Sequence, residues 1–237
     1  MTSTPRPIPA APTRARVILA FATLYTVWGS SYLFIKWVVA DIPAFVAAAL
    51  RHGLAGILLY AWTRTHGAPR PTLEQWGVAA VVGTVLLASG NGMVNWASQR
   101  LPSGLSALIV SSVPIWIVLL DWLRPHGTRP TGRTIAGLTL GSLGITGLVW
   151  SARGAETRSG SSTILVGCVG LLLGSLSWAA GSILSRQLPR QRHGGLATAM
   201  EMTAAGIVLI PVSWLTGDLA HFHPHTCRPL VGWRWPT

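Results

Sequence analysis

Long apolar runs alternate with short polar linkers along almost the whole chain. Seven such runs cover residues 17–39, 44–62, 76–98, 104–123, 134–151, 163–185 and 195–216. A helix needs about 20 mostly apolar residues to cross the hydrocarbon core of a bilayer, and each run has close to that length. The pattern predicts an all-α, polytopic transmembrane bundle of about seven helices.

Basic residues are distributed unevenly between the linkers. If residues 1–16, MTSTPRPIPAAPTRAR, form a cytosolic tail, eleven Lys and Arg residues of the tail and linkers fall on the cytoplasmic side and four on the outer side. Short cytoplasmic loops of membrane proteins are enriched in Lys and Arg. The distribution therefore predicts a multi-pass protein of the cytoplasmic membrane with its N-terminus in the cytoplasm.

Composition narrows the classes of function. Hydrophobic residues make up 50% of the chain and charged residues 10%, whereas a soluble domain carries about 25% charged residues. The net charge of +12 comes mostly from basic residues beside the apolar runs and not from a groove-sized patch, which argues against a nucleic-acid partner. The apolar runs hold no paired carboxylates and no nucleophile with a neighbouring base, so we expect neither an enzyme nor a cofactor.

The cysteines and histidines predict neither a disulfide framework nor a metal site. Cys168 lies in an apolar run, far from the second cysteine in the polar tail. That tail holds four side chains of a kind that ligates zinc: His221, His223, His225 and Cys227. They stand in a mixture of Pro, His, Trp and Arg, so we expect the cluster to be accidental and assign no metal.

Two parts of the chain share a pattern at an offset of 150 residues. Trp28 is followed eight residues later by Lys36, and Trp178 is followed eight residues later by Arg186. Five spans lie between the matching elements, so the second copy crosses the membrane in the opposite sense, as in inverted-repeat transporters. A chance match between helices rich in Ala, Leu and Gly is the alternative. The offset continues without a gap into the next runs, where it pairs Ala47 with Ala197, Gly56 with Gly206 and Leu59 with Leu209.

The offset also predicts the organisation of the chain. Residues 17–151 form a first five-helix repeat, 152–162 an exterior linker, and 163–216 the first two helices of an inverted second repeat. Three further spans, ending near residue 301, are predicted by the offset, but residues 217–237 are polar instead. We therefore expect a C-terminal truncation or a change of reading frame. The alternative is a seven-span protein with a polar exterior tail.

Three stretches of the sequence resemble a known family. They are WGSSYLFIKWVV in the first run, IPAFVAAALRHGLAG in the second, and NWASQRLPSGLSALIVSSVPIWIVLL across the third and fourth. Together they look like the EamA-type members of the drug/metabolite transporter superfamily, over about residues 17–216. The resemblance implies a ten-helix bundle of two five-helix repeats that exports or exchanges small metabolites, amino acids or drugs across the cytoplasmic membrane.

Two ionisable residues lie deep in the predicted spans. A charge there is costly unless it faces a partner or a wet cavity, so Arg51 is the leading candidate to anchor an anionic group of a substrate. A purely structural charge between helices is the alternative. Glu201 is the one carboxylate deep in a run, and it stands 150 residues after Arg51, so the two are counterparts under the offset (offset mates). We expect these two residues to pair at the repeat interface, so that protonation of Glu201 or substrate binding breaks the pair and couples transport to protons.

Smaller polar residues are further candidates for substrate contact. Trp28, Ser30 and Ser31 lie at a Gly-Ser-Ser interruption of the first run. Asn91 and Asn95 are four residues apart and share one face of the third helix. Each of these side chains is suited either to a substrate cavity or to holding helices together.

Proline and glycine predict the shape and packing of three helices. Pro114 interrupts the fourth helix just after Ser111 and Ser112, where the kink is a gate if it moves and a static bend otherwise. Small residues allow close approach between helices. We therefore expect helix packing or dimer contacts at Gly170 with Gly174, and along the stripe Gly137, Gly141, Gly144 and Gly147.

Two function classes follow. The first is a secondary transporter, exporting in direction, that moves small organic metabolites, amino acids or drugs by alternating access; its partners are a small-molecule substrate and the lipid bilayer. The second is a non-transporting truncated fragment or helper subunit that associates with a second copy or with another helical membrane protein.

Overall fold

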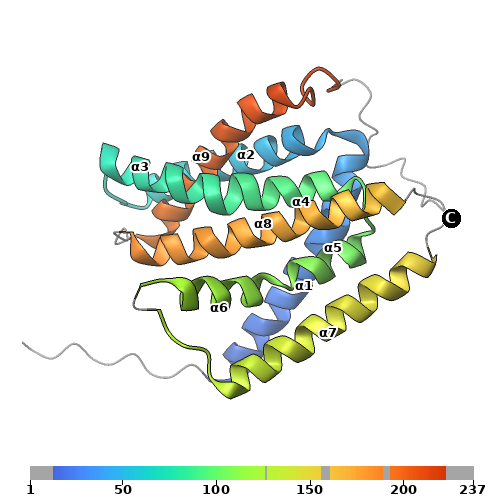
Figure 1. Ribbon diagram of the computed structural model, residues 1–237. Coiled ribbons are helices and arrows are strands. Elements are labelled where there is room, and N and C mark those ends of the chain that lie inside the picture. Colours follow the sequence, from blue (N-terminus) through green and yellow to red (C-terminus); the bar gives the residue numbers. More distant parts are fainter. Residues whose placement is uncertain (1–12, 126, 156–160, 189–192, 223–237) are drawn as a thin grey trace, which may run out of the picture.

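The structure is a computed structural model that describes residues 13–125, 127–155, 161–188 and 193–222 (Figure 1). All regular secondary structure in these residues is helical, which confirms the predicted all-α fold. The expected tail up to residue 12, residues 156–160 of the expected linker, and the tail from residue 223 lie outside the described part. The elements are α1 (Arg14–Asp41), α2 (Ala44–Thr65), α3 (Leu73–Val82), the π-helix η1 (Gly83–Ser89), α4 (Gly90–Ser98), α5 (Ser103–Val110), α6 (Val113–Leu123), α7 (Gly132–Ala155), α8 (Ser161–Gln187) and α9 (Gly194–Leu215).

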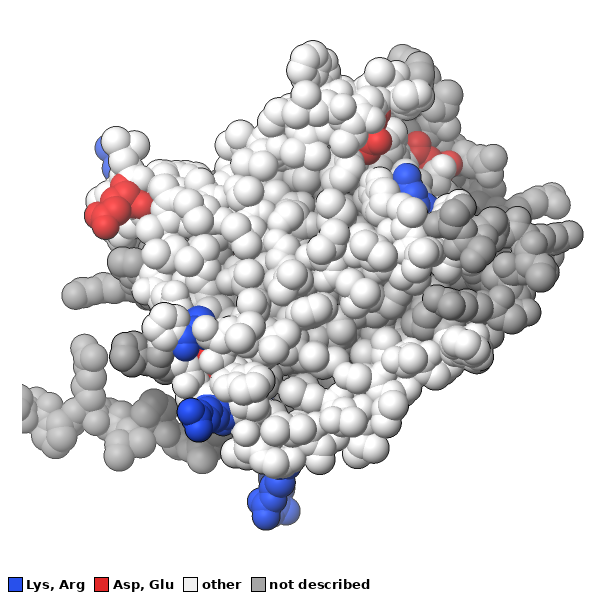
Figure 2. All heavy atoms as spheres, viewed as in Figure 1, with Lys and Arg blue, Asp and Glu red and all other residues white. Residues whose placement is uncertain are grey.

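These helices form seven segments that follow the seven apolar runs. α3, η1 and α4 continue into one another, and α5 and α6 together cover the fourth run. Within the described residues, six segments are long and apolar enough to cross a membrane; α7, which is rich in Gly, Thr and Ser, is not among them. Figure 2 shows a face dominated by uncharged residues, with the charged side chains toward its margins. Long apolar helices and an uncharged face are what a multi-pass membrane protein presents to lipid.

α2 and α9 form the most extensive interface of the bundle, and they lie antiparallel (Figure 1). The backbone N–H of Phe45, in the first turn of α2, donates to a carboxylate oxygen of Asp218, just beyond α9, at 2.8 Å. At the other end of α2, Thr63 lies against Gly195, in the first turn of α9. The two helices therefore stay in contact over nearly their full length.

An approximate two-fold relation connects α2 and α9 where they cross. A Cβ on Gly56 would lie 2.5 Å from the backbone N of Thr203, and a Cβ on Gly206 would lie 2.6 Å from the Cα of Gly53. Under the 150-residue offset Gly53 corresponds to Thr203 and Gly56 to Gly206. Replacing each residue of the first contact by its counterpart 150 residues away therefore gives the second contact, as a two-fold axis requires. The bounds of the two helices also differ by 150 residues at both ends. The offset noticed in the sequence is thus a feature of the packing of these two helices.

α8 lies along the third span, and its glycines allow the close approach. A Cβ on Gly170 would lie 2.6 Å from the ring of Trp96, and one on Gly174 would lie 2.8 Å from the Cβ of Met93. The predicted packing role of Gly170 and Gly174 is therefore confirmed. In α7, by contrast, a Cβ would meet nothing within 4 Å among the described residues at any member of the predicted stripe: Gly137, Gly141, Gly144 and Gly147. A dimer contact through this stripe stays a prediction.

α1 lies at the outside of the bundle, where Ile35 and Val39 pack into the core and two further side chains make polar or aromatic contacts with its neighbours. The rings of Trp28 and Trp178, which are offset mates, have centroids 5.9 Å apart. The Nζ of Lys36 donates to the carbonyl oxygens of Ser98, at 2.7 Å, and Leu101, at 3.0 Å. A cation stabilises the C-terminal end of a helix because the carbonyls there lack partners within the helix. Lys36 thus holds the end of α4 against α1.

We expect the contact between Asp218 and α2 to stabilise the fold measurably. The N-cap residue of α2, Pro43, makes no side-chain cap of its own. Because a carboxylate or amide oxygen at a helix N-terminus satisfies free N–H groups, Asp218→Leu should lower the free energy of unfolding by about 1 kcal/mol, whereas Asp218→Asn should change it little. Thermal unfolding of the purified protein in detergent checks this, and equal losses in both variants would contradict it.

Candidate functional site

The guanidinium of Arg51 lies between α2 and α4. One of its nitrogens, Nη2, donates to the side-chain oxygen of Asn91 at 3.2 Å and lies 3.3 Å from Nε2 of the neighbouring His52. Among the described residues the one ion pair joins Arg124 to Asp121 at 3.4 Å, so Arg51 has neutral partners in this part of the chain. A cation inside a membrane span normally has a counter-charge or faces a wet cavity. The structure therefore presents a guanidinium whose charge its described contacts do not balance.

Asn91 and Asn95 both face α2, as their shared helix face predicts. Asn95 is 3% exposed, and its amide nitrogen donates to the carbonyl oxygen of Ala44 at 3.2 Å. Its side-chain oxygen has no partner in the described part of the chain, and the same holds for Nδ1 of His52, which is 4% exposed. Arg51, His52 and Asn91 are thus joined by side-chain contacts, and Asn95 lies one turn further along α4; these four residues are here called the Arg51 cluster.

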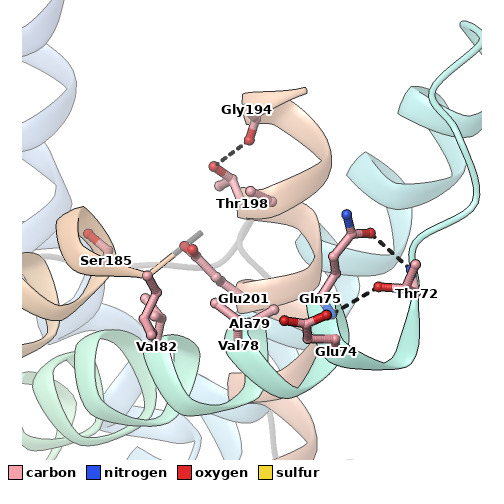
Figure 3. Close-up of a pocket in the computed structure, with 12 residues that line it drawn as sticks. Thr72, Glu74, Gln75, Val78, Ala79, Val82, Ser185, Gly194, Thr198 and Glu201 are labelled. Atoms are coloured by element: carbon pink, nitrogen blue, oxygen red, sulfur yellow. Dashed lines mark hydrogen bonds between the residues drawn. The ribbon is translucent and has the colours of Figure 1, made fainter. Parts of the chain in front are cut away.

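Glu201 lies in a different place, on a cavity of about 530 Å³ between α3, α8 and α9. In Figure 3, Glu201 of α9 lies between Ser185 of α8 and the α3 residues Glu74 and Gln75. The first turns of α3 and α9 both reach this cavity, at Glu74 and Gly194. Two carboxylates, those of Glu74 and Glu201, thus line this cavity at one end of the bundle. Its lining residues are Thr72, Glu74, Gln75, Val78, Ala79, Val82, Ser185, Leu188, Gly194, Ala197, Thr198 and Glu201.

The geometry of the crossing explains why the structure does not pair Arg51 with Glu201. Offset mates of two antiparallel helices meet only near the two-fold axis, which passes between Gly53 and Gly56. The same register places Glu201 opposite Leu58, so Arg51 lies seven residues away, or about 10 Å along the helix axis. The two residues are equivalent by sequence but lie on opposite sides of the crossing.

The π-helix η1 connects the cavity to the Arg51 cluster. It begins after Val82, which lines the cavity, and ends just before Asn91. In this wider turn the backbone carbonyl oxygen of Val85 accepts hydrogen bonds from two side chains. The hydroxyl of Ser177 on α8 donates to it at 2.7 Å, and the hydroxyl of Ser89 donates to it at 3.1 Å. π-helical turns are rare and frequent at functional sites. Hydrophobic periodicity did not predict this one, because η1 is as apolar as its neighbours.

The remaining predicted residues make other contacts than those of the Arg51 cluster in the described part of the chain. Trp28 contacts α8, and the hydroxyls of Ser30 and Ser31 donate to the carbonyl of Val27 in their own helix, at 3.1 and 2.7 Å. Pro114 stands at the second position of α6, just after the break between α5 and α6, so the predicted interruption of the fourth helix is observed. A role of this break as a moving gate stays a prediction. Within the described residues, no group of three or more His, Cys, Asp or Glu side chains is placed to hold a metal ion.

Several known proteins are similar in sequence to this chain over most of its length. Residues 15–150 match the EamA-like transporter family. The chain is 36% identical over 200 residues to the uncharacterized inner membrane transporter YedA of Escherichia coli (strain K12), which covers 84% of this chain and 62% of YedA. It is 29% identical over 215 residues to an uncharacterized transporter of Synechocystis sp., covering 85% of this chain and 64% of the relative. Protein PecM of Dickeya dadantii is 27% identical over 197 residues, covering 81% of this chain and 61% of PecM. No solved structure matches the chain.

These matches fit the helical architecture and the resemblance noted in the sequence. The chain spans about three fifths of the length of these relatives. The names of the family and of the relatives YedA and the Synechocystis protein indicate transport and not catalysis. Because the family match covers more than half of the chain, the protein belongs to the EamA-like transporter family.

Proposed function

We propose that this protein is a secondary transporter that exports small organic solutes across the cytoplasmic membrane, with Arg51 as the contact for an anionic group of the solute. The observation that carries the proposal is the half-buried guanidinium of Arg51, whose described partners, Asn91 and His52, are both neutral. An anionic solute would supply the missing counter-charge, and Arg binds carboxylates and phosphates through paired N–H donors. Asn91 orients the guanidinium by accepting a hydrogen bond from it at 3.2 Å.

The two sides of the α2–α9 crossing suggest how the solute site could alternate between the two faces of the membrane. With the N-terminus in the cytoplasm, as the basic linkers predict, the end of α2 and the cavity at Glu201 face the cytoplasm. The Arg51 cluster then lies beyond the crossing, toward the outer face. α8 and α9 would act as the first two helices of an inverted second repeat that tilts against the first about this crossing. Pro114 and η1 are the irregular segments best able to absorb such a movement.

Expression in cells gives the first test of this function. Cells that produce the protein should release one or more small organic anions into the medium faster than cells that carry the empty vector. Mass spectrometry of the medium identifies these solutes without a prior choice of substrate. If the external solutes are the same although the protein is present in the membrane, the proposal fails and a helper role, in association with another membrane protein, takes its place.

Glu201 is proposed as the group through which protons are coupled to transport. Its carboxylate lies on the cavity at the far side of the crossing from Arg51. Glutamine resembles the protonated carboxyl, so Glu201→Gln should keep solute binding but flatten the pH dependence of transport. Glu74 lies on the same cavity and is exposed, so Glu74→Gln is the matched control and should retain the pH dependence. Unchanged rates and unchanged pH dependence in Glu201→Gln would remove Glu201 from the mechanism.

A further inference from the structure

A groove of about 540 Å³, here called the α6–α7 groove, lies between α6 and the first half of α7. Its walls are mostly apolar side chains, and the hydroxyls of Thr139 and Ser142 donate to carbonyls within α7. Along α6 it extends from Ile115 to Trp122, which is about 10 Å of the roughly 15 Å that one leaflet of the hydrocarbon core measures. Trp122 and Ile135 are exposed, so the groove opens to the outside of the described bundle.

Basic residues gather at one end of the α6–α7 groove. Arg129 lines the groove itself, and Arg133 lies in the first turn of α7. Arg124 is the C-cap residue of α6 and lines a smaller groove with the last turn of α8, where Arg186 lies. Figure 2 shows blue side chains following one another along its lower-left margin, over the ends of α6 and α8 and the start of α7. Among the described residues the one ion pair at this end joins Arg124 to Asp121, so three of the four arginine charges are not neutralised by them.

The linker between α6 and α7 is folded so that Arg129 stays at the groove. One carboxylate oxygen of Asp121, Oδ2, accepts hydrogen bonds from the backbone N–H of Thr128 at 3.3 Å and from its hydroxyl at 2.5 Å. The other oxygen, Oδ1, lies 3.4 Å from a guanidinium nitrogen of Arg124. Arg129 follows Thr128 directly, and Pro130, which also lines the groove, has a fixed φ. The basic end of the groove is therefore a feature of the folded linker and not only of long side chains.

The apolar walls and the basic end together select the occupant of the groove. A small soluble anion would pair with the arginines but leave the apolar walls uncovered, and an apolar helix would cover the walls but leave the charges. An anionic phospholipid satisfies both, because guanidinium groups bind phosphate through paired donors and an acyl chain matches the walls. Basic pockets between helices at the membrane surface bind such headgroups. Trp122 lies at the same end, and Trp side chains of membrane proteins are enriched at the level of the headgroups.

We propose that the α6–α7 groove binds one anionic phospholipid, with its phosphate at Arg129 and Arg133 and one acyl chain between the two helices. Arg124 and Arg186 add positive potential around the headgroup. With the N-terminus in the cytoplasm, as the basic linkers predict, the bound molecule belongs to the inner leaflet. The groove shares no lining residue with the Arg51 cluster or with the cavity at Glu201. The proposal does not rest on transport: binding is expected even if the chain moves nothing.

Native mass spectrometry of the full chain in detergent measures the bound lipid directly. Dioleoylphosphatidylglycerol, which is anionic, and dioleoylphosphatidylcholine, which is zwitterionic, carry the same acyl chains and are added in equal amounts. The anionic lipid should bind at one copy per chain and about tenfold more tightly than the zwitterionic one. Equal binding of the two would mean ordinary lipid around the helices and would overturn the proposal. A dimer of the chain that forms in place of the lipid complex would overturn it as well.

One pair of variants tests the basic end of the groove. Arg129→Gln should weaken binding of the anionic lipid about fivefold, since one basic residue near an anionic headgroup contributes about that factor. Arg70→Gln removes the same charge from an exposed position in another linker and should bind like the wild type. Glycerol 3-phosphate carries the phosphate without acyl chains and should not displace the lipid. Equal effects of the two variants, or displacement by glycerol 3-phosphate, would contradict a phospholipid site.

A second pair of variants tests the apolar walls. Leu138→Trp places a larger side chain in the groove and should lower binding of the anionic lipid about tenfold, because the acyl chain and the indole ring compete for the same space. Leu140→Trp makes the same change at an exposed position of α7 outside the groove and should bind like the wild type. Equal binding by the two variants would show that the acyl chain does not lie between α6 and α7, and would overturn the proposal.

Discussion

Replacing Arg51 by glutamine should abolish most transport of an anionic solute while leaving the protein at least as stable as before. Hydrogen bonds to a charged group contribute about 1.5–3 kcal/mol, so the loss corresponds to roughly 10- to 150-fold in the rate at low solute concentration. The stability follows from the described partners, which are neutral: removing the charge removes its desolvation cost and breaks no ion pair among the described residues. Flux into vesicles and thermal unfolding in detergent measure the two effects on the same preparation.

This combination separates the two roles that the sequence leaves open for Arg51. A charge that merely holds helices together would lower stability when removed, and any loss of transport would follow from unfolding. Arg51→Lys keeps the charge but not the planar pair of donors, so it should retain part of the activity. Arg70→Gln makes the same change at an exposed position and is the matched control. A clear loss of stability in Arg51→Gln, with transport reduced in proportion, would assign Arg51 a structural role only.

Adding one methyl group at the crossing of α2 and α9 should cost more stability than any other substitution considered for this chain. A Cβ on Gly56 would lie 2.5 Å from the backbone N of Thr203 and 2.6 Å from its side-chain oxygen. The backbone cannot yield without moving α9, so Gly56→Ala should lower the free energy of unfolding by about 3 kcal/mol. For a chain of this size the midpoint of thermal unfolding falls by roughly 10 °C. Loss of helical circular dichroism on heating measures it.

Gly53 provides the control for this substitution, one turn away in the same helix. A Cβ on Gly53 would meet nothing within 4 Å, so Gly53→Ala should unfold near the wild-type temperature. The two-fold relation adds a second expectation: Gly206→Ala, at the offset mate of Gly56, should cost about as much as Gly56→Ala, because its Cβ would lie 2.6 Å from the Cα of Gly53. Equal midpoints for Gly53→Ala and Gly56→Ala would contradict the close approach of the helices.

The parts of the fold that hydrophobic pattern controls could be predicted from the sequence. Each apolar run is a helical segment in the structure. A break precedes Pro114, because proline has no backbone N–H and fits in the first turn of a helix better than in its interior. The offset of 150 residues matched α2 with α9, and in the structure the two helices have the same length and place small residues at their crossing. α7 is helical as predicted, but its many glycines and hydroxyl residues lower its mean hydropathy, so it is not among the six segments apolar enough to cross a membrane.

Contacts between side chains could be predicted only in part. Arg51 and Asn91 were each singled out, and the structure joins them, but nothing in the sequence says that the register of α2 and α4 brings them within 3.2 Å. Equivalence of Arg51 and Glu201 suggested a pair, yet equivalent residues of antiparallel helices approach only at the axis. The sequence holds no pattern that predicts η1, because the backbone hydrogen-bond register of a helix depends on the packing of several helices at once.

Transport by the purified chain tests the central claim most directly. The protein is placed in lipid vesicles, and the solutes identified in the cell medium are loaded on one side, with protein-free vesicles and Arg51→Gln vesicles in parallel. The proposal predicts saturable movement of an anionic solute in wild-type vesicles, and a rate near the protein-free level for Arg51→Gln. Movement that is absent for every solute although the chain is folded and inserted, or equal in wild-type and Arg51→Gln vesicles, would contradict it.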